Sequence, residues 1–144
     1  MKNKFWITEL PRYSIIIFVL FNIIAMFLYA GGNLNNHEQI GYVFIQNFFS
    51  DLGRRYSYTG NSNIISCVFF NTSLTVVGFT FIMLFYKIKD VFIEYKIFAG
   101  LDALFGIWSG LSYIGVAFTP ADLYLDVHIL FNMWVFRFFL FLIL

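Results

Sequence analysis

Four long runs of hydrophobic residues, separated by shorter polar segments, make up most of the chain. They cover residues 13–30, 64–86, 97–118 and 120–144. A helix rises about 1.5 Å per residue and the hydrocarbon core of a bilayer is about 30 Å thick, so about 20 apolar residues span it. Backbone polar groups in lipid must be satisfied within each segment and the runs lack β-barrel alternation, so the spans are expected to be helices. The pattern predicts an all-α membrane protein, a single domain over residues 1–144 with a bundle of four transmembrane helices.

The segment 31–63 is the longest polar stretch, and it predicts an outer loop that is partly helical. Asn36 and Gln39 have the spacing of a capping box, and Gly53 suits the position just after a helix end. The hydrophobic residues between them recur at helical spacing, and these are Ile40, Val43, Phe44 and Phe48. We therefore expect an amphipathic helix between residues 36 and 53 that lies in the headgroup plane or packs over the bundle.

Two short patterns make local predictions about the spans. Thr119, Pro120 and Asp122 are residue types expected at the N-cap, the first and the third position of a helix, so the fourth span is expected to begin there. Gly106 and Gly110 form a Gly-x-x-x-Gly pair, whose small size lets two helices approach closely. That contact is expected within the chain, and a homo-oligomer through the same pair is the alternative.

The composition agrees with lipid as the main solvent, because 60% of the residues are hydrophobic and only 12% are charged. The net charge of +1 gives no sign of nucleic-acid binding, and a single cysteine, Cys67, excludes an internal disulfide. Of the 9 Lys and Arg, six lie in the N-terminal segment and between the second and third runs, against two in residues 31–63. By the positive-inside rule, this predicts a multi-pass protein of the cell membrane with a cytoplasmic N-terminus.

Two charged residues fall inside the predicted spans, Asp102 in the third and Arg137 in the fourth. Both lie roughly 8–10 Å from the cytoplasmic ends of their spans, counted by the helical rise. An isolated charge in the bilayer is costly, and such residues usually pair. We therefore expect an ion pair between Asp102 and Arg137, with the alternative that Arg137 reaches the cytoplasmic headgroups by itself.

Polar side chains collect at the outer end of the predicted bundle. They come from the loop, from the outer halves of the second and third spans and from the start of the fourth. The members are Asn47, Ser50, Asp51, Arg54, Arg55, Asn71, Thr75, Ser109, Ser112, Asp122, Asp126, His128 and Asn132. Unpaired polar atoms at membrane depth are costly, so the set is expected to face inward and form a network. It would either tie the loop to the helices or line a pocket that opens at the outer leaflet.

Three segments of the chain resemble a known membrane family. Residues 47–55 read NFFSDLGRR, residues 69–78 read FFNTSLTVVG, and residues 115–128 read GVAFTPADLYLDVH. They are similar to the multispan family called domain of unknown function 998, itself distantly similar to the Frag/DRAM group of membrane proteins. The matching positions are Asn47, Ser50, Asp51, Leu52, Gly53, Phe70, Asn71, Gly115, Pro120 and His128. Members of that family are typically longer, with more spans and no established activity, so the resemblance implies that this chain is a truncated member.

Two classes of function fit these residues. The first is binding of a lipid headgroup or small polar ligand, with membrane lipids as partners and arginines that attract an anionic group. Its candidate residues are Asn47, Ser50, Asp51, Arg54, Arg55, Asn71, Asp122 and His128. The second is a membrane-embedded hydrolase or metal-dependent lipid-modifying enzyme that uses Ser50, Asp51 and His128. Ser50 lacks a Gly-x-Ser-x-Gly elbow and one well-placed histidine makes a poor metal site, so we expect no metal or cofactor. We favour a protein without catalysis, which either binds a ligand or uses its polar cluster only to hold the loop.

Overall fold

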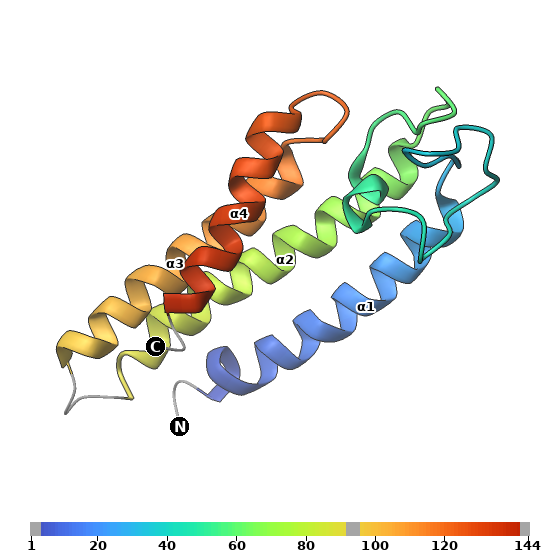
Figure 1. Ribbon diagram of the computed structural model, residues 1–144. Helices are drawn as coiled ribbons and strands as arrows, with labels where there is room; N and C mark the ends of the chain where they lie inside the picture. The colour runs from blue at the N-terminus through green and yellow to red at the C-terminus, as the bar shows by residue number, and fades with distance from the viewer. Residues whose placement is uncertain (1–3, 92–95, 142–144) are drawn as a thin grey trace.

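The computed structural model describes residues 4–91 and 96–141, and within them the chain is all-helical (Figure 1). The four α-helices are α1 (Leu10–Leu28), α2 (Ile64–Ile88), α3 (Lys96–Phe118) and α4 (Leu125–Phe141). A π-helical turn, Phe5–Glu9, leads into α1, and a short 3₁₀ helix, Phe49–Gly53, lies between α1 and α2. The predicted all-α class is therefore confirmed.

Three of the helices are long and apolar enough to cross a membrane. They are Phe5–Leu28, Ile64–Ile88 and Ile97–Phe118. Their outward faces carry large exposed hydrophobic side chains, among them Ile15, Phe27 and Ile97, which lipid solvates better than water does. The described part of α4 is shorter, with 17 residues. The end of the fourth predicted span, residues 142–144, lies outside the described residues.

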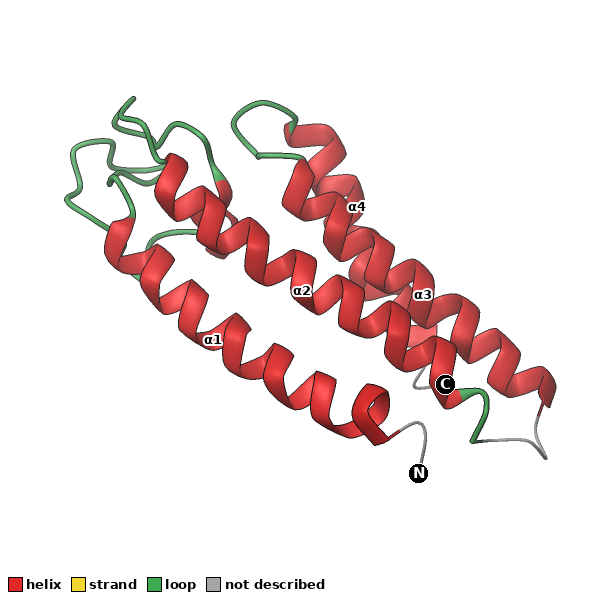
Figure 2. Ribbon diagram, turned by 180° about the vertical axis from the view of Figure 1, so that it is seen from behind, coloured by secondary structure: helices red, strands yellow, loops and turns green. Residues whose placement is uncertain are grey.

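The helices run up and down in chain order, with α2 between α1 and α3 and with α4 along α3 (Figure 1, Figure 2). The loop between α1 and α2 and the connection between α3 and α4 lie at one end of the bundle. The end of α2 and the start of α3 lie at the other end. Polar residues from the loop and from the start of α4 can therefore meet, as the sequence predicts.

Glycines let α2 and α3 approach closely where they cross. A Cβ atom added at Gly78 would lie 2.5 Å from the backbone oxygen of Gly110, and one added at Gly110 would lie 2.6 Å from that of Gly78. A Cβ atom added at Gly106 would collide with the ring of Phe85. The pair Gly106 and Gly110 thus makes a close contact between helices of the same chain, which is the first of its two expected roles.

The predicted start of the fourth helix is wrong, because Thr119, Pro120 and Asp122 lie in a turn before α4. The Thr119 hydroxyl donates to the backbone oxygen of Gly115 at 2.8 Å, so it completes the last turn of α3. The Pro120 carbonyl oxygen accepts the N–H of Tyr124 at 2.9 Å. The Asp122 carboxylate bonds to the loop between α1 and α2 and therefore does not cap a helix.

The predicted ion pair between Asp102 and Arg137 is absent from the structure. Both side chains are exposed, and the guanidinium of Arg137 lies over the Trp134 ring, 5.4 Å from its centroid. Among the described residues, the salt bridge that does form joins Arg12 to Glu9 at 3.3 Å. An exposed guanidinium that packs on an aromatic face needs no carboxylate partner, which explains why the pair does not form.

Candidate functional site

Residues 29–63, here called the cap, fold over one end of the bundle. The prediction of an amphipathic helix between residues 36 and 53 is wrong. In this fully described range only Phe49–Gly53 is helical, as a 3₁₀ segment. Asn36 accepts a backbone N–H two residues further on and forms a turn, and Gln39 bonds to other side chains. Short polar side chains that bond to nearby backbone compete with helix formation, and here they prevail.

Asn47 is the centre of the hydrogen bonds in the cap. Its amide nitrogen donates to the Gly32 carbonyl oxygen at 2.8 Å and to Asp51 Oδ2 at 3.2 Å. Its amide oxygen accepts from Gln39 Nε2 at 2.8 Å and from the N–H of Val43 at 3.0 Å. The side chain is buried and uses all of its hydrogen-bonding positions. The predicted polar network therefore exists in the cap, and it holds the backbone there.

Asp51 belongs to the same network and is 2% exposed. In addition to the Asn47 amide, Oδ2 accepts the N–H of Phe48 at 2.9 Å, where the 3₁₀ helix begins. Burial raises the pKa of the Asp51 carboxyl above its ordinary value of 3.8, while these hydrogen bonds and the charge of Arg54 oppose the rise. Asp51 therefore stabilises the cap together with Asn47.

The cap is fastened to the helices around the start of α2. Asn63, the last cap residue before α2, donates its amide to the Leu52 carbonyl oxygen at 3.3 Å, and the Ser66 hydroxyl in α2 donates to the same oxygen at 3.2 Å. Gly53 lies so close to α2 that an added Cβ atom would be 2.6 Å from the Phe70 ring. Gly53 is the last residue of the 3₁₀ helix, one position before the place just after a helix that the sequence predicts, and its lack of a Cβ atom allows close approach to α2.

Asp122 joins the cap to the connection between α3 and α4. Its Oδ1 accepts the N–H of Arg55 at 3.0 Å, and its Oδ2 accepts the N–H of Tyr56 at 3.0 Å. Hydrogen bonds to an ionised carboxylate are stronger than neutral ones, so this pair fixes both segments.

The guanidinium of Arg54 lies 4.0 Å from the centre of the Tyr58 ring and thus packs within the cap.

His128, on the first turn of α4, is 4% exposed. Its Nδ1 lies 2.6 Å from the carbonyl oxygen of Thr119, the residue directly after α3. Its Nε2 is buried and has no hydrogen-bond partner among the described residues. Buried polar atoms without a partner are rare because an unmade hydrogen bond is costly, and the other such side-chain atom among the described residues is Asn22 Oδ1 in α1.

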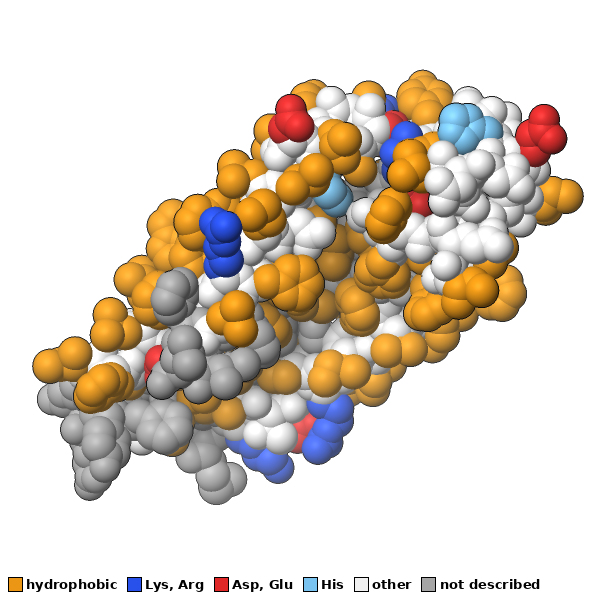
Figure 3. Space-filling view, viewed as in Figure 1, with side chains coloured by type: hydrophobic (Ala, Val, Ile, Leu, Met, Phe, Trp, Pro, Cys, Tyr) orange, Lys and Arg blue, Asp and Glu red, His pale blue; other side chains and the backbone are white. Residues whose placement is uncertain are grey.

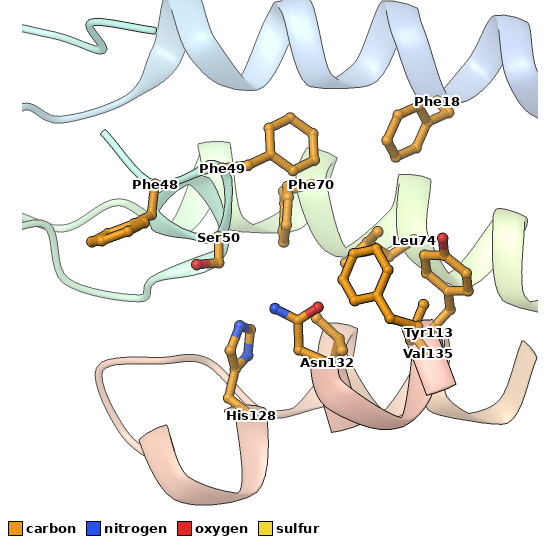
Figure 4. Close-up of a pocket in the computed structure, with 12 residues that line it drawn as sticks. Phe18, Phe48, Phe49, Ser50, Phe70, Leu74, Tyr113, His128, Asn132 and Val135 are labelled. Atoms are coloured by element: carbon orange, nitrogen blue, oxygen red, sulfur yellow. The ribbon is translucent and has the colours of Figure 1, made fainter. Parts of the chain in front are cut away.

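A cavity of about 340 Å³ lies beside His128 and is bordered by the cap and by all four helices (Figure 4). Three polar side chains border it toward one end, and they are Ser50, His128 and Asn132. The rest of the wall is hydrophobic or aromatic: Phe18, Phe48, Phe49, Phe70, Leu74, Tyr113, Val116, Val135 and Phe136. Its size and its mostly apolar wall are typical of small-molecule sites, which measure about 300–1,000 Å³.

The cavity is not sealed from the surroundings of the protein. Asn132 and Phe136 line it and are themselves exposed on α4. Figure 3 shows the face on which the molecule is hollowed between α4 and α1, with hydrophobic side chains along both borders. An amphipathic molecule could therefore reach the polar end while its apolar part stays among hydrophobic side chains.

The structure brings Ser50 and His128 to one cavity but does not assemble the predicted catalytic trio. Histidine Nδ1 bonds to a carbonyl oxygen, and the Asp51 carboxylate bonds to Asn47 and Phe48. A nucleophilic serine needs a base within hydrogen-bond reach and a third group that orients that base. Within the described residues, no three His, Cys, Asp or Glu side chains are placed to hold a metal ion together.

The rest of the predicted polar set divides among separate places. Arg55 and Asn71 line a second, smaller hollow of about 230 Å³. Ser109 in α3 donates to the backbone oxygen of Val135 in α4 at 3.3 Å, and Asp126 is exposed. The single cluster expected from the sequence is therefore divided among the hydrogen-bonded cap, the polar end of the cavity, the second hollow and a bond between α3 and α4.

The aromatic wall of the cavity was missed by the sequence analysis. The chain has 21 Phe, and their spacing does not separate those that line a cavity from those that face lipid. One local signal was available, because Phe48 and Phe49 directly precede Ser50 and Phe70 directly precedes Asn71. Aromatic residues beside polar ones in these segments indicate a site with both apolar and polar walls.

A scan against protein-family models, a search of curated proteins and a search of solved structures each found no match. The resemblance of residues 47–55, 69–78 and 115–128 to the domain of unknown function 998 family stays a prediction. The class of protein therefore rests on the chain itself, which is all-helical in the described part and has three helices long and apolar enough to cross a membrane.

Proposed function

We propose that this chain is a multi-pass integral membrane protein that binds an amphipathic ligand, a lipid or another molecule with one polar group, in the cavity beneath the cap. The polar group would lie against Ser50, His128 and Asn132, and the apolar part would lie along the aromatic wall. The observation that carries the proposal is a mostly apolar cavity with one buried, unpartnered histidine nitrogen at its polar end. A cap with a purely structural role gives no reason for an unpartnered histidine nitrogen beside a cavity of this kind.

The ligand can be tested by mass spectrometry of the purified protein under conditions that preserve bound lipids. Val135→Phe places a larger side chain into the cavity, where Val135 is 3% exposed. Val127→Phe makes the same change on the same helix at a side chain that is 43% exposed. We expect a bound amphiphile in the wild type and in Val127→Phe, and its loss in Val135→Phe. Equal retention in both variants, with both still folded, would contradict binding in this cavity.

We also propose that the cap lies outside the cell membrane and the N-terminus in the cytoplasm. The support is the larger number of Lys and Arg in the N-terminal segment and between α2 and α3. Cysteines introduced at the exposed residues Asn61, in the cap, and Lys89, at the other end, test this orientation. A membrane-impermeant maleimide should label Asn61→Cys in intact cells and Lys89→Cys only after permeabilisation. The reverse pattern would overturn the orientation.

A further inference from the structure

We infer that the cavity selects neutral amphiphiles that carry a hydroxyl group over matching ethers and carboxylates. The inference rests on the proposed function, because it names the chemical class of the ligand in that same cavity. It follows from the hydrogen bond that His128 makes through Nδ1, because that bond determines what the unpartnered Nε2 can do.

The partner of Nδ1 fixes which ring nitrogen carries the hydrogen. Nδ1 of His128 lies 2.6 Å from the Thr119 carbonyl oxygen, and a carbonyl oxygen can only accept a hydrogen bond. Nδ1 must therefore be the donor, and in the neutral ring Nε2 carries a lone pair and no hydrogen. Nε2 thus presents an acceptor, so the ligand has to supply a donor.

The cavity beside the ring is lined by uncharged side chains. His128 is 4% exposed, and the side chains that share the cavity with it are hydrophobic, aromatic or uncharged polar groups. A charged ligand group buried here without a partner would therefore cost far more than a neutral one. A carboxylate or phosphate ligand would also place acceptor atoms against the Nε2 lone pair, and such ligands are therefore disfavoured.

A hydroxyl group matches the polar end of the cavity in both of its roles. It can donate its hydrogen to Nε2, and its oxygen can accept from the Asn132 amide or the Ser50 hydroxyl, which line the same cavity. A methyl ether of the same chain keeps the acceptor oxygen and loses the donor. The comparison of alcohol with ether therefore isolates the hydrogen bond to Nε2.

This chemistry has two sources in a membrane, a lipid with a free hydroxyl on its glycerol or headgroup and a free long-chain alcohol. The probes are four photoreactive diazirines: a dodecanol, its methyl ether, the matching fatty acid and a diacylglycerol. The protein is placed in phosphatidylcholine nanodiscs and irradiated with each probe. Labelling of peptides that line the cavity is divided by labelling of the outward face of α1, which corrects for partition into the bilayer.

The wild type should label in the cavity on the order of tenfold more with the alcohol than with the ether or the acid, as expected for one hydrogen bond to a buried group. Diacylglycerol labelling equal to or above that of dodecanol assigns the site to a lipid, and weaker labelling assigns it to a free alcohol. His128→Phe should remove the preference, and His37→Phe, at the exposed histidine of the cap, should keep it.

The outcomes separate this inference from the proposed function. Equal cavity labelling by alcohol and ether in the wild type, or stronger labelling by the acid, would overturn the hydroxyl preference and leave amphiphile binding intact. No cavity labelling by any probe would contradict the proposed function itself. Nitrogen-15 NMR of histidine-labelled wild type reads the tautomer without a variant. It should show one ring with protonated Nδ1 and unprotonated Nε2, and the opposite tautomer would overturn the inference.

Discussion

The cap and the helix bundle are held together by different forces. The cap buries polar side chains, such as Asn47 and Asp51, that bond to its backbone and to one another. The bundle depends on close backbone approach, as between Gly78 and Gly110, and on contacts between apolar side chains. In a lipid environment the hydrophobic drive between helices is absent and dispersion at close range replaces it, whereas the cap relies on directed hydrogen bonds.

The cavity lies where these two regions meet. Helices that pack through small residues fit closely along α2 and α3, whereas the cavity opens where the cap meets α1 and α4. The cap is held by its own hydrogen bonds, so it can keep its shape above the cavity without packing side chains into it. Substitutions in the two regions should therefore have separable effects.

Gly110→Leu should have the largest effect, because the added side chain would meet the backbone of α2. Overpacking at a rigid contact of this kind costs about 3 kcal/mol or more, and the variant should lose the folded state in detergent. Gly100→Leu is the control, since an added Cβ atom at Gly100 meets nothing within 4 Å. Size-exclusion profiles and thermal unfolding of the two proteins check this. Equal stability would mean that α2 and α3 are not packed through glycine.

Asn47→Ala should rank second, because it leaves several buried partners in the cap without a hydrogen bond. The expected loss is about 2–3 kcal/mol of unfolding free energy, with the helices still folded. Faster amide hydrogen exchange in residues 31–53, with unchanged exchange in α2 and α3, is the measurement. Asn61→Ala, at an exposed asparagine in the same cap, should change neither the free energy of unfolding nor the amide exchange of residues 31–53. Uniformly faster exchange through all helices would contradict the separation of cap and bundle.

Asp122→Ala should have a smaller effect, confined to the contact between the cap and the α3–α4 connection. Its carboxylate is partly exposed, so losing two backbone hydrogen bonds should cost about 1 kcal/mol. Limited trypsin digestion should then cut faster at Arg54 and Arg55. Asp126→Ala is a matched control because Asp126 is exposed on the next helix. Equal cleavage rates in the two variants would show that Asp122 does not hold the cap.

The smallest effect concerns the dependence of stability on pH. Burial raises the pKa of the Asp51 carboxyl in the folded state. The folded protein therefore holds the proton of this carboxyl more tightly than the unfolded chain does. The resulting stabilisation is complete below the ordinary value of 3.8 and is lost as the pH rises through the raised value. Asp51→Asn cannot titrate, so the wild type should lose stability relative to it across that window. Thermal midpoints between about pH 3 and about pH 7 measure this, and parallel curves would contradict it.

The bundle could be predicted from the sequence more fully than the cap. The runs 64–86 and 97–118 match α2 and α3 closely, because the length of an apolar segment is set by the membrane and is visible in the sequence. The predicted helix between residues 36 and 53 does not form because Asn36 and Asn47 accept nearby backbone N–H groups, and Asn47 also bonds to Gly32, which no local pattern reveals. Local propensity predicts an element only where no tertiary bond competes with it.

The candidate site was predicted in part. Ser50 and His128 were expected to come together and both line the cavity, whereas Asp51 was expected beside them and bonds within the cap. Asp122 has the sequence position of a helix cap, yet its carboxylate bonds to the backbone of Arg55. Carboxylates can accept bonds from any nearby N–H, so residue type alone did not show which N–H groups they would meet.

The central claim is that a ligand with one polar group occupies the space beside His128, and its most direct test is an experimental structure of the protein in lipid nanodiscs at a resolution that shows bound lipids. The account predicts elongated density along the aromatic wall of the cavity, with its polar end about 3 Å from His128 Nε2. A cavity that is closed by its own side chains, or density that never approaches Nε2, would contradict it.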